Sequence, residues 1–218
     1  MRSVHRGDHP IQDNGERHRF QPYSNAAPHL KERLGRYCSF CERFVSSGLA
    51  VEHKLSKLHH EHLEFEWSNF LLACLNCNST KATREVAGVE AMFPDTHNTF
   101  GAIEYLPSGR IRARETLSAN DRIAADALLE LVGLSKEPRE LSVADDRWKD
   151  RIELWRLAHG SLECLQRNDT PEIRELIVSY AKGKGGFSIW MAVFADVPDM
   201  QTAFVKAFPG TRLYSEAA

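Results

Sequence analysis

Four of the five cysteines stand in two pairs, each with two residues between its members: Cys38 with Cys41, and Cys74 with Cys77. A two-residue gap lets both sulfurs of a pair reach one ion, and two such pairs make a closed tetrahedral site of four thiolates. Two separate redox-active pairs are the alternative. We favour a structural zinc ion because the pairs account for every cysteine except Cys164, which lies in an apolar helical pattern and is expected to be buried.

The segment around the second pair contains the residue types that phosphodiester hydrolysis requires: an oxygen ligand for a hard cation, a general base and a positive charge for the phosphate. Glu52 and His53 are neighbours on an expected strand and offer a carboxylate and an imidazole. Asn78 is expected to begin a helix and to give the ion a second oxygen. Lys81, three residues later on the same helical face, is expected to meet the phosphate. Oxygen ligands favour Mg²⁺ or Mn²⁺ as the catalytic ion.

The motifs CSFC, VEHKL and WSNFLLACLNCNSTK together resemble the zinc-stapled HNH endonucleases. The resemblance implies a ββα-metal fold in which a hairpin carries Glu52 and His53, a loop carries Asn69 and a helix carries Asn78. It implies that His53 is the general base and that Asn69 orients the base or its loop. It also implies that Glu52 and Asn78 hold the catalytic metal. Two positions depart from the name-giving pattern, because residue 78 is Asn rather than His and residue 52 is Glu rather than Asp.

A closer resemblance covers the motifs MRSVHRG, YCSFCER, NFLLACLNCNSTK and FSIWMAVFADVP. These resemble the nuclease subunits (PtuB-like) of Septu anti-phage defence systems, whose relatives also accompany retrons. The resemblance implies an ABC/SMC-like ATPase subunit (PtuA-like) as partner, a nucleic-acid substrate for which DNA is favoured over RNA, and in some systems a retron RNA or its msDNA. Recruitment by a partner would account for a formal net charge of -2, since proteins that bind nucleic acid alone are usually basic.

Periodicity and turn signals predict an α+β chain that is mostly α. Residues 1–36 read as an N-terminal arm with a short helix, 37–90 as the zinc-stapled HNH module, and 91–218 as a β-hairpin plus a helical region that is a candidate for docking the partner. The hairpin is expected at 102–114, turning at Pro107-Ser108-Gly109. Ser118 with Asp121, and Ser142 with Asp145, read as capping boxes that open helices, and Thr170-Pro171 reads as another helix start.

Three further features have both a functional and a structural interpretation. His59, His60 and His62 form a cluster that is either a second metal site or, as we prefer, a polar loop. The run from Gly183 to Gly186 resembles a phosphate loop but lacks its spacing, so we expect a helix end and a flexible joint. Five aromatic residues form either a helical core or part of a partner interface: Phe187, Trp190, Phe194, Phe204 and Phe208.

The composition limits the class of protein. Of the 218 residues, 42% are hydrophobic and 27% are charged, which is ordinary for a globular protein and excludes a largely disordered chain. No apolar run approaches the roughly 18–20 residues of a membrane-spanning helix, and the first ten residues contain no apolar signal core. We therefore expect a cytoplasmic protein, where thiols stay reduced and paired cysteines bind metals.

Two alternative functions remain open at this stage. The first is a nuclease of the same system that cleaves RNA, for example tRNA, because nothing in the motif reads a 2′-hydroxyl group. The second is a non-catalytic zinc adaptor that couples the ATPase to its target. An adaptor would have no need of Glu52 and His53 near Asn78, and metal-dependent cleavage that is lost in His53→Ala separates the two.

Overall fold

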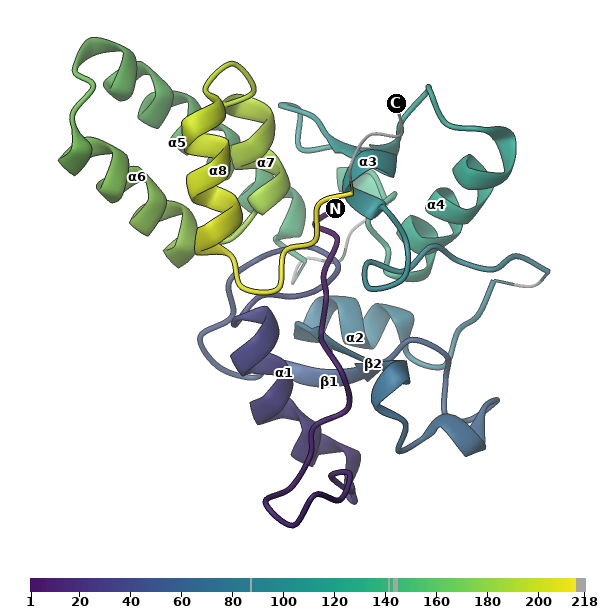
Figure 1. The fold of residues 1–218 in the computed structure, drawn as a ribbon. Helices are drawn as coiled ribbons and strands as arrows, with labels where there is room; N and C mark the ends of the chain where they lie inside the picture. The colour runs from purple at the N-terminus through teal and green to yellow at the C-terminus, as the bar shows by residue number, and fades with distance from the viewer. Residues whose placement is uncertain (87, 141, 143–144, 215–218) are drawn as a thin grey trace.

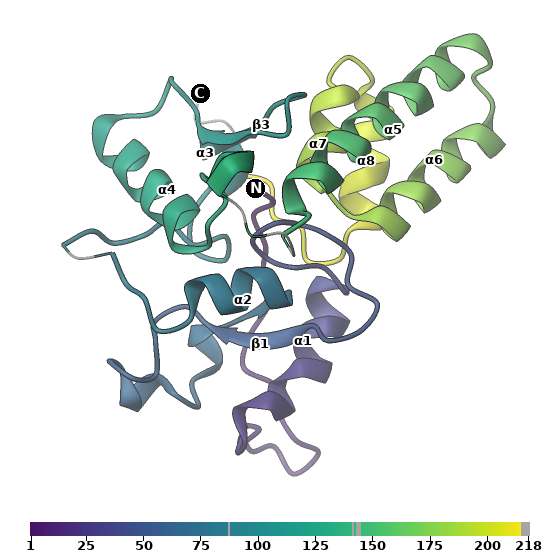
Figure 2. The same cartoon turned by 180° about the vertical axis from the view of Figure 1, so that it is seen from behind.

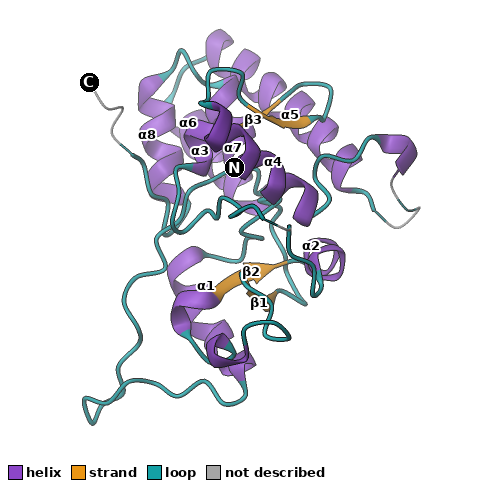
Figure 3. Cartoon of the chain, turned by 90° about the vertical axis from the view of Figure 1, so that its right-hand side faces the viewer, coloured by secondary structure: helices purple, strands orange, loops and turns teal. Residues whose placement is uncertain are grey.

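The computed structural model describes residues 1–86, 88–140, 142 and 145–214. In these residues the chain is α+β and mostly helical, with two small antiparallel sheets of two strands each, as predicted (Figure 3). The helices and strands in chain order are η1 (Tyr23–Ala26), α1 (Ala27–Leu34), β1 (Ala50–His53), η2 (Glu61–Leu63), η3 (Trp67–Asn69), β2 (Phe70–Ala73), α2 (Leu75–Lys81), α3 (Thr99–Ala102), β3 (Ile103–Tyr105), β4 (Ile111–Ala113), α4 (Ala119–Leu131), η4 (Pro138–Glu140), α5 (Arg147–Arg167), α6 (Pro171–Lys184), α7 (Phe187–Val193) and α8 (Pro198–Ala207).

Strands β1 and β2 form a hairpin that is followed directly by α2, so the order is strand, strand, helix. His53 pairs with Phe70 and Glu52 with Leu71 across the hairpin. All four residues of β2 are buried, because α2 packs on the strands toward the helical part and α1 and η1 contact them from the other side (Figures 1 and 2). A strand covered on both faces reads as a continuous apolar run, which is the pattern of Phe70–Ala73.

The second half of the chain forms a helical part above this hairpin in Figure 1. Helix α5 packs against α6 and α7, and α8 packs against α6 and α7. The five aromatic side chains of the C-terminal region, which were candidates for a partner interface, have at most 1% exposure. They fill the core of this helical part, so a partner that docks there must contact other side chains.

The N-terminal arm joins the two halves rather than lying apart from them. Val4 pairs with Thr211 in an antiparallel bridge, and the backbone N–H of His5 donates to the carbonyl of Gly210 at 2.7 Å. Further along, Arg6 donates to the carbonyl of Phe70 at 3.2 Å. The indole of Trp67 donates to the carbonyl of Gly7 at 3.0 Å. The first residues therefore contact the C-terminal residues and the hairpin at once.

Several local predictions are confirmed. Strands β3 and β4 form the hairpin expected around Pro107-Ser108-Gly109. The hydroxyl oxygen of Ser118 accepts from the N–H of Asp121 and caps α4, and Thr170 caps α6 in the same way. The capping box at Ser142 is wrong, because α5 begins only at Arg147.

The expected burial of Cys164 is also wrong. This cysteine is exposed on α5, because the apolar residues around it in the sequence face the other side of the helix. Within the described ranges, no helix combines the length and the apolar character needed to cross a membrane.

Candidate metal centre and nuclease site

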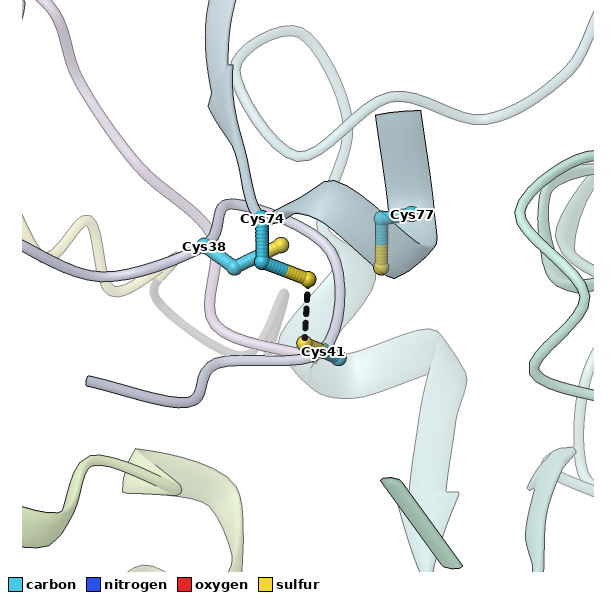
Figure 4. A group of neighbouring side chains, drawn as sticks. All are labelled: Cys38, Cys41, Cys74 and Cys77. Atoms are coloured by element: carbon cyan, nitrogen blue, oxygen red, sulfur yellow. Dashed lines mark hydrogen bonds between the residues drawn. The ribbon is translucent and has the colours of Figure 1, made fainter. Parts of the chain in front are cut away.

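The four paired cysteines converge on one point at the junction of the two halves (Figure 4). Their sulfur atoms all lie within 4.8 Å of one another, and the sulfurs of Cys41 and Cys74 are 3.6 Å apart. Four sulfurs around one zinc ion at about 2.3 Å each are separated by roughly 3.8 Å, so the arrangement fits a tetrathiolate site. All four are buried, and they could hold one zinc ion as the sequence predicts.

The chain conformation explains why these cysteines meet. Cys74 directly follows β2 and is the N-cap of α2, and Cys77 lies in the first turn of that helix. Cys38 and Cys41 lie on a tight turn that is attached to β2, because Ser39 N–H donates to the carbonyl of Leu72 at 2.7 Å. This attachment of the turn to β2 brings the two pairs together, although 32 residues separate Cys41 from Cys74 in the sequence.

The clustered thiols hydrogen-bond one another, and three of them have a shifted pKa. The pKa of Cys74 is lowered far below its usual range because the neighbouring thiols, Cys38 foremost, donate hydrogen bonds to its sulfur. The pKa of Cys41 is raised by its interactions with Cys38 and Cys74, and the pKa of Cys77 is raised mainly by burial. Metal binding would replace these shared protons, because only thiolates bind zinc.

A buried arginine lies against this centre. Arg147, the first residue of α5, has 3% exposure and donates from Nη1 to the sulfur of Cys77 at 3.2 Å. Its Nε and Nη2 donate to the two carboxylate oxygens of Asp145 at 2.8 and 2.7 Å. An N–H donor to a ligand sulfur stabilises its negative charge, so Arg147 is an outer-shell partner of the centre.

Glu42, which follows Cys41, connects the metal centre to the arm and to the helical part. Its carboxylate accepts from the N–H of Arg2 at 2.5 Å, and from the N–H and hydroxyl of Ser188 at 2.8 and 2.6 Å. The side chain is 2% exposed and its φ is 64°. One carboxylate thus holds three segments that are far apart in the sequence.

The glycine-rich run that resembled a phosphate loop docks on the same segment. The backbones of Gly185 and Arg43 form an isolated antiparallel β-bridge. The N–H of Gly186 donates to the carbonyl of Glu42 at 2.9 Å. A Cβ atom at position 185 would lie 2.3 Å from that carbonyl oxygen, and φ at Gly185 is +80°. The glycine is required for close backbone contact at the end of α6, and Gly185 is the helix C-cap as predicted.

Glu52 and Lys81 form a buried ion pair between β1 and α2. Lys81 Nζ lies 3.0 Å from Glu52 Oε1, and the side chains are 0% and 8% exposed. Burial raises the pKa of Glu52, and the charge of Lys81 opposes this rise. Lys81 was predicted to meet a phosphate, whereas its ammonium group is closed off from solvent here because α2 packs this face onto β1.

His53 is held at the end of β1 with 8% exposure. Its Nε2 lies 2.8 Å from the carbonyl oxygen of Glu64, and a carbonyl oxygen can only accept, so Nε2 carries the proton. In the neutral ring Nδ1 then keeps its lone pair. Burial lowers the pKa of His53, with further lowering from Lys57 and Lys81, which favours this neutral form. The ring has the tautomer of a base that takes a proton at Nδ1.

Asn69 binds the loop that connects β1 and β2. Its amide accepts from the N–H of Leu55 at 2.9 Å and donates to the carbonyls of Leu55 and Leu63 at 3.0 and 3.3 Å. The carbonyl of Leu63 directly precedes Glu64, whose own carbonyl contacts His53. Asn69 is 3% exposed, so it fixes the loop that orients the histidine.

Asn78 is half-buried on α2, one turn before Lys81. The prediction that Asn78 begins a helix is wrong, because α2 starts at Leu75. The donor chemistry of Asn78 and Glu52 suits Mg²⁺ or Mn²⁺, since both offer oxygen and the pairing with Lys81 uses one carboxylate oxygen of Glu52. The charge of Lys81 acts on both neighbours, because it opposes the raised pKa of Glu52 and contributes to the lowered pKa of His53.

The cluster of His59, His60 and His62 does not bring three metal-ligating side chains together. In the part of the chain that the structure describes, the cysteine cluster is the one group of three or more His, Cys, Asp and Glu side chains close enough to share an ion. His60 instead lies 3.0 Å from the carboxylate of Glu85. The preferred interpretation of this loop as polar and partly exposed agrees with its burial.

The sequence patterns did not indicate four residues that lie around the cysteine cluster or His53: Tyr23, Glu42, Lys57 and Arg147. Glu42 follows a cysteine pair, but its partners lie about 40 and 146 residues away. Arg147 and Cys77 are 70 residues apart. Contacts of this kind leave no local spacing signal in one sequence.

The sequence was also compared with known proteins. No model of a protein family matches it, and no curated protein matches it either. The proposal of a function therefore depends on the side chains, their geometry and the sequence resemblance.

Proposed function

We propose that this protein is a metal-dependent HNH endonuclease that hydrolyses phosphodiester bonds in nucleic acid. The observation that carries the proposal is the state of His53: a buried imidazole at the end of the first strand of a strand–strand–helix unit, with Nε2 bound to a backbone carbonyl and Nδ1 left basic. In the proposed reaction His53 Nδ1 removes a proton from the attacking water. Asn69 keeps the Glu64 carbonyl in place while it does so.

Two metal ions belong to this proposal. Zinc on Cys38, Cys41, Cys74 and Cys77 would hold the turn, the hairpin and α2 together, because so small a unit has little core of its own. Glu52 and Asn78 would hold Mg²⁺ or Mn²⁺ at the catalytic site. When bound, this ion supplies positive charge to the phosphate in the transition state.

We further propose the setting that the sequence resemblance implies. The enzyme would be the nuclease effector of a cytoplasmic anti-phage defence system, working with an ABC/SMC-like ATPase subunit. DNA is the favoured substrate, with RNA as the second arm of the test. A formal net charge of -2 supports delivery by a partner, since the chain alone has little electrostatic attraction for a polyanion.

The experiment compares cleavage of plasmid DNA and of bulk RNA by wild type, His53→Ala and the control His159→Ala, whose ring lies on α5 beside Trp155. Each is assayed with EDTA, Mg²⁺ or Mn²⁺, with and without the proposed ATPase subunit. We expect metal-dependent cleavage by wild type and His159→Ala, and a loss of at least about 100-fold in His53→Ala. Cleavage that persists in His53→Ala, or no cleavage with the ATPase and zinc both present, contradicts the proposal. The second result favours the adaptor.

A further inference from the structure

The ring of His53 is enclosed by residues from three separate segments. The side chain of Phe70, its partner across the hairpin, lies with its ring centre 5.3 Å away at 81°. The backbone of Glu64 accepts from Nε2. The third neighbour is Tyr23 in η1, whose ring centre is 4.6 Å away at 70°. Tyr23 lies in the N-terminal arm, outside the region predicted to form the nuclease module.

Tyr23 is linked through Lys57 to the side chain of Glu64, the same loop residue whose backbone carbonyl binds His53. The ammonium of Lys57 lies 4.7 Å from the centre of the Tyr23 ring, within cation–π range. The same ammonium lies 2.9 Å from Glu64 Oε1. The contacts therefore form a closed circuit that runs from His53 to Tyr23, Lys57 and Glu64 and back to His53.

This circuit constrains the orientation of an imidazole in a way that one hydrogen bond does not. A ring held only at Nε2 can still tilt about that bond and about its own side-chain torsions. An edge-on aromatic neighbour on one face removes this freedom, because the ring edge carries positive charge and prefers the face of its neighbour. Phe70 limits the ring in a second direction.

The exposure of Tyr23 and Lys57 argues against a purely structural role for these two residues. Lys57 has a side chain that is 45% exposed, and Tyr23 is only partly buried. Surface ion pairs of this kind contribute little to folding, typically between 0 and about 1 kcal/mol. Their removal should therefore leave the fold intact while it frees the ring that they hold.

We propose that Tyr23 and Lys57 are positioning residues that hold the His53 imidazole with Nδ1 available to water. The N-terminal arm would thus complete the site that the hairpin begins. The catalytic consequence rests on the proposed nuclease function, whereas the orientation of the ring does not.

The orientation is tested without any cleavage, by NMR of the ring nitrogens of ¹⁵N-histidine-labelled protein, with the His53 signals assigned by their loss in His53→Gln. We expect the Nε2–H tautomer with sharp signals in wild type. Tyr23→Ala and Tyr23→Leu should give averaged or broadened His53 signals, whereas Tyr23→Phe keeps the wild-type signals because the contact uses the ring. Tyr180→Ala, at a more exposed tyrosine on α6, is the control. Wild-type His53 signals in both Tyr23→Ala and Tyr23→Leu overturn the proposal.

Lys57 is tested in the same way with two substitutions of similar length. Lys57→Met removes the charge and should disturb the His53 signals, and Lys57→Arg should restore them because a guanidinium also binds a carboxylate and an aromatic face. The control is Lys149→Met, which breaks another exposed lysine–carboxylate pair, that with Asp146 at 3.1 Å. Equal effects of Lys57→Met and Lys57→Arg contradict the role of the charge.

Cleavage kinetics give the second readout. Tyr23→Ala and Lys57→Met should lower kcat by about 10- to 100-fold, as expected for a misplaced catalytic group, with KM changed less than about 2-fold. Tyr23→Phe and Lys57→Arg should recover most of kcat. If wild type does not cleave, the proposed function fails and the NMR result still decides the orientation. If wild type cleaves and Tyr23→Ala cleaves equally well, this inference alone fails.

Discussion

The ammonium of Lys81 lies 3.0 Å from a carboxylate oxygen of Glu52, and the lysine side chain is completely buried. It makes no well-aligned hydrogen bond to any described residue, so the carboxylate is its main source of compensation. We expect Lys81→Met or Glu52→Gln alone to lower the free energy of unfolding by about 3 kcal/mol, because each leaves one buried group unpaired. The double variant should be more stable than the sum of the two losses predicts. Urea denaturation of the four proteins measures this coupling, and additive losses would contradict it.

Cleavage should depend on pH through His53. Burial lowers the pKa of this imidazole below 6.5, so the basic form dominates above that value. The rate should rise with pH through an apparent pKa below 6.5 and then reach a plateau. A pH–rate profile at saturating metal checks this, and a rising limb centred above pH 7 would contradict it.

The same shift makes stability depend on pH. Because the folded state disfavours the protonated ring, the unfolded state binds more protons below pH 6.5. The contribution of His53 to stability is thus complete above that value and is lost as the pH falls toward the folded pKa. The difference between wild type and His53→Gln in denaturation series from pH 5 to pH 8 isolates this contribution from that of other histidines.

The four cysteines should bind one zinc ion per chain. Metal analysis of the purified protein should give one equivalent for wild type and for Cys164→Ser, whose thiol is exposed on α5. Cys74→Ser should lose zinc and much of its solubility, because the turn, β2 and α2 are joined through this centre. A soluble Cys74→Ser protein with full activity would contradict a structural role for the ion.

Arg147 should control how firmly that zinc is held. Arg147→Met removes the donor to the Cys77 sulfur and leaves Asp145, with a side chain only 9% exposed, without its arginine. We expect roughly 10- to 100-fold weaker zinc retention in a competition with a chromogenic chelator. Arg156→Met, at an exposed position of the same helix, is the control. Equal retention in both variants would show that the N–H···S contact does not matter.

Gly185 and Gly183 give opposite expectations for the same substitution. Gly185→Ala places a Cβ atom against the backbone of Glu42 at a left-handed φ and should lower the midpoint of thermal unfolding by several degrees. Gly183 lies in α6, and a Cβ atom there meets nothing within 4 Å. Gly183→Ala should stabilise the protein by about 0.5–1 kcal/mol, because alanine favours a helix. Calorimetry on the two variants checks both signs.

The comparison with the sequence shows which signals are local. Cysteine spacing predicts the cluster of four cysteines that could hold a metal ion, because each pair is a turn of four residues. The β3–β4 hairpin and the caps at Ser118 and Thr170 depend on equally short patterns. The start of α2 was missed because Cys74 caps the helix without a side-chain hydrogen bond and the first helical residue, Leu75, is 78% exposed.

The environment of the candidate base depends on contacts that no short pattern encodes. The burial of Lys81 follows from which face of a seven-residue helix packs on β1, and so short a helix has little periodicity to indicate it. Tyr23 reaches His53 across 30 residues, and Arg147 reaches Cys77 across 70. The residue types at the site can therefore be predicted from the sequence, whereas the way they are held cannot.

The pairing of Val4 with Thr211 affects the order in which contacts form while the chain is synthesised. Two segments about 200 residues apart must meet, so the first residues have no partner there until Thr211 has been synthesised. Contacts of such high sequence separation are costly in chain entropy and form late. The hydrogen bond between Glu42 and Ser188 also forms late, because Ser188 is synthesised long after Glu42. The first residues of the arm thus pair only after synthesis of the helical part, whereas Tyr23 and the hairpin that carries His53 are synthesised well before it.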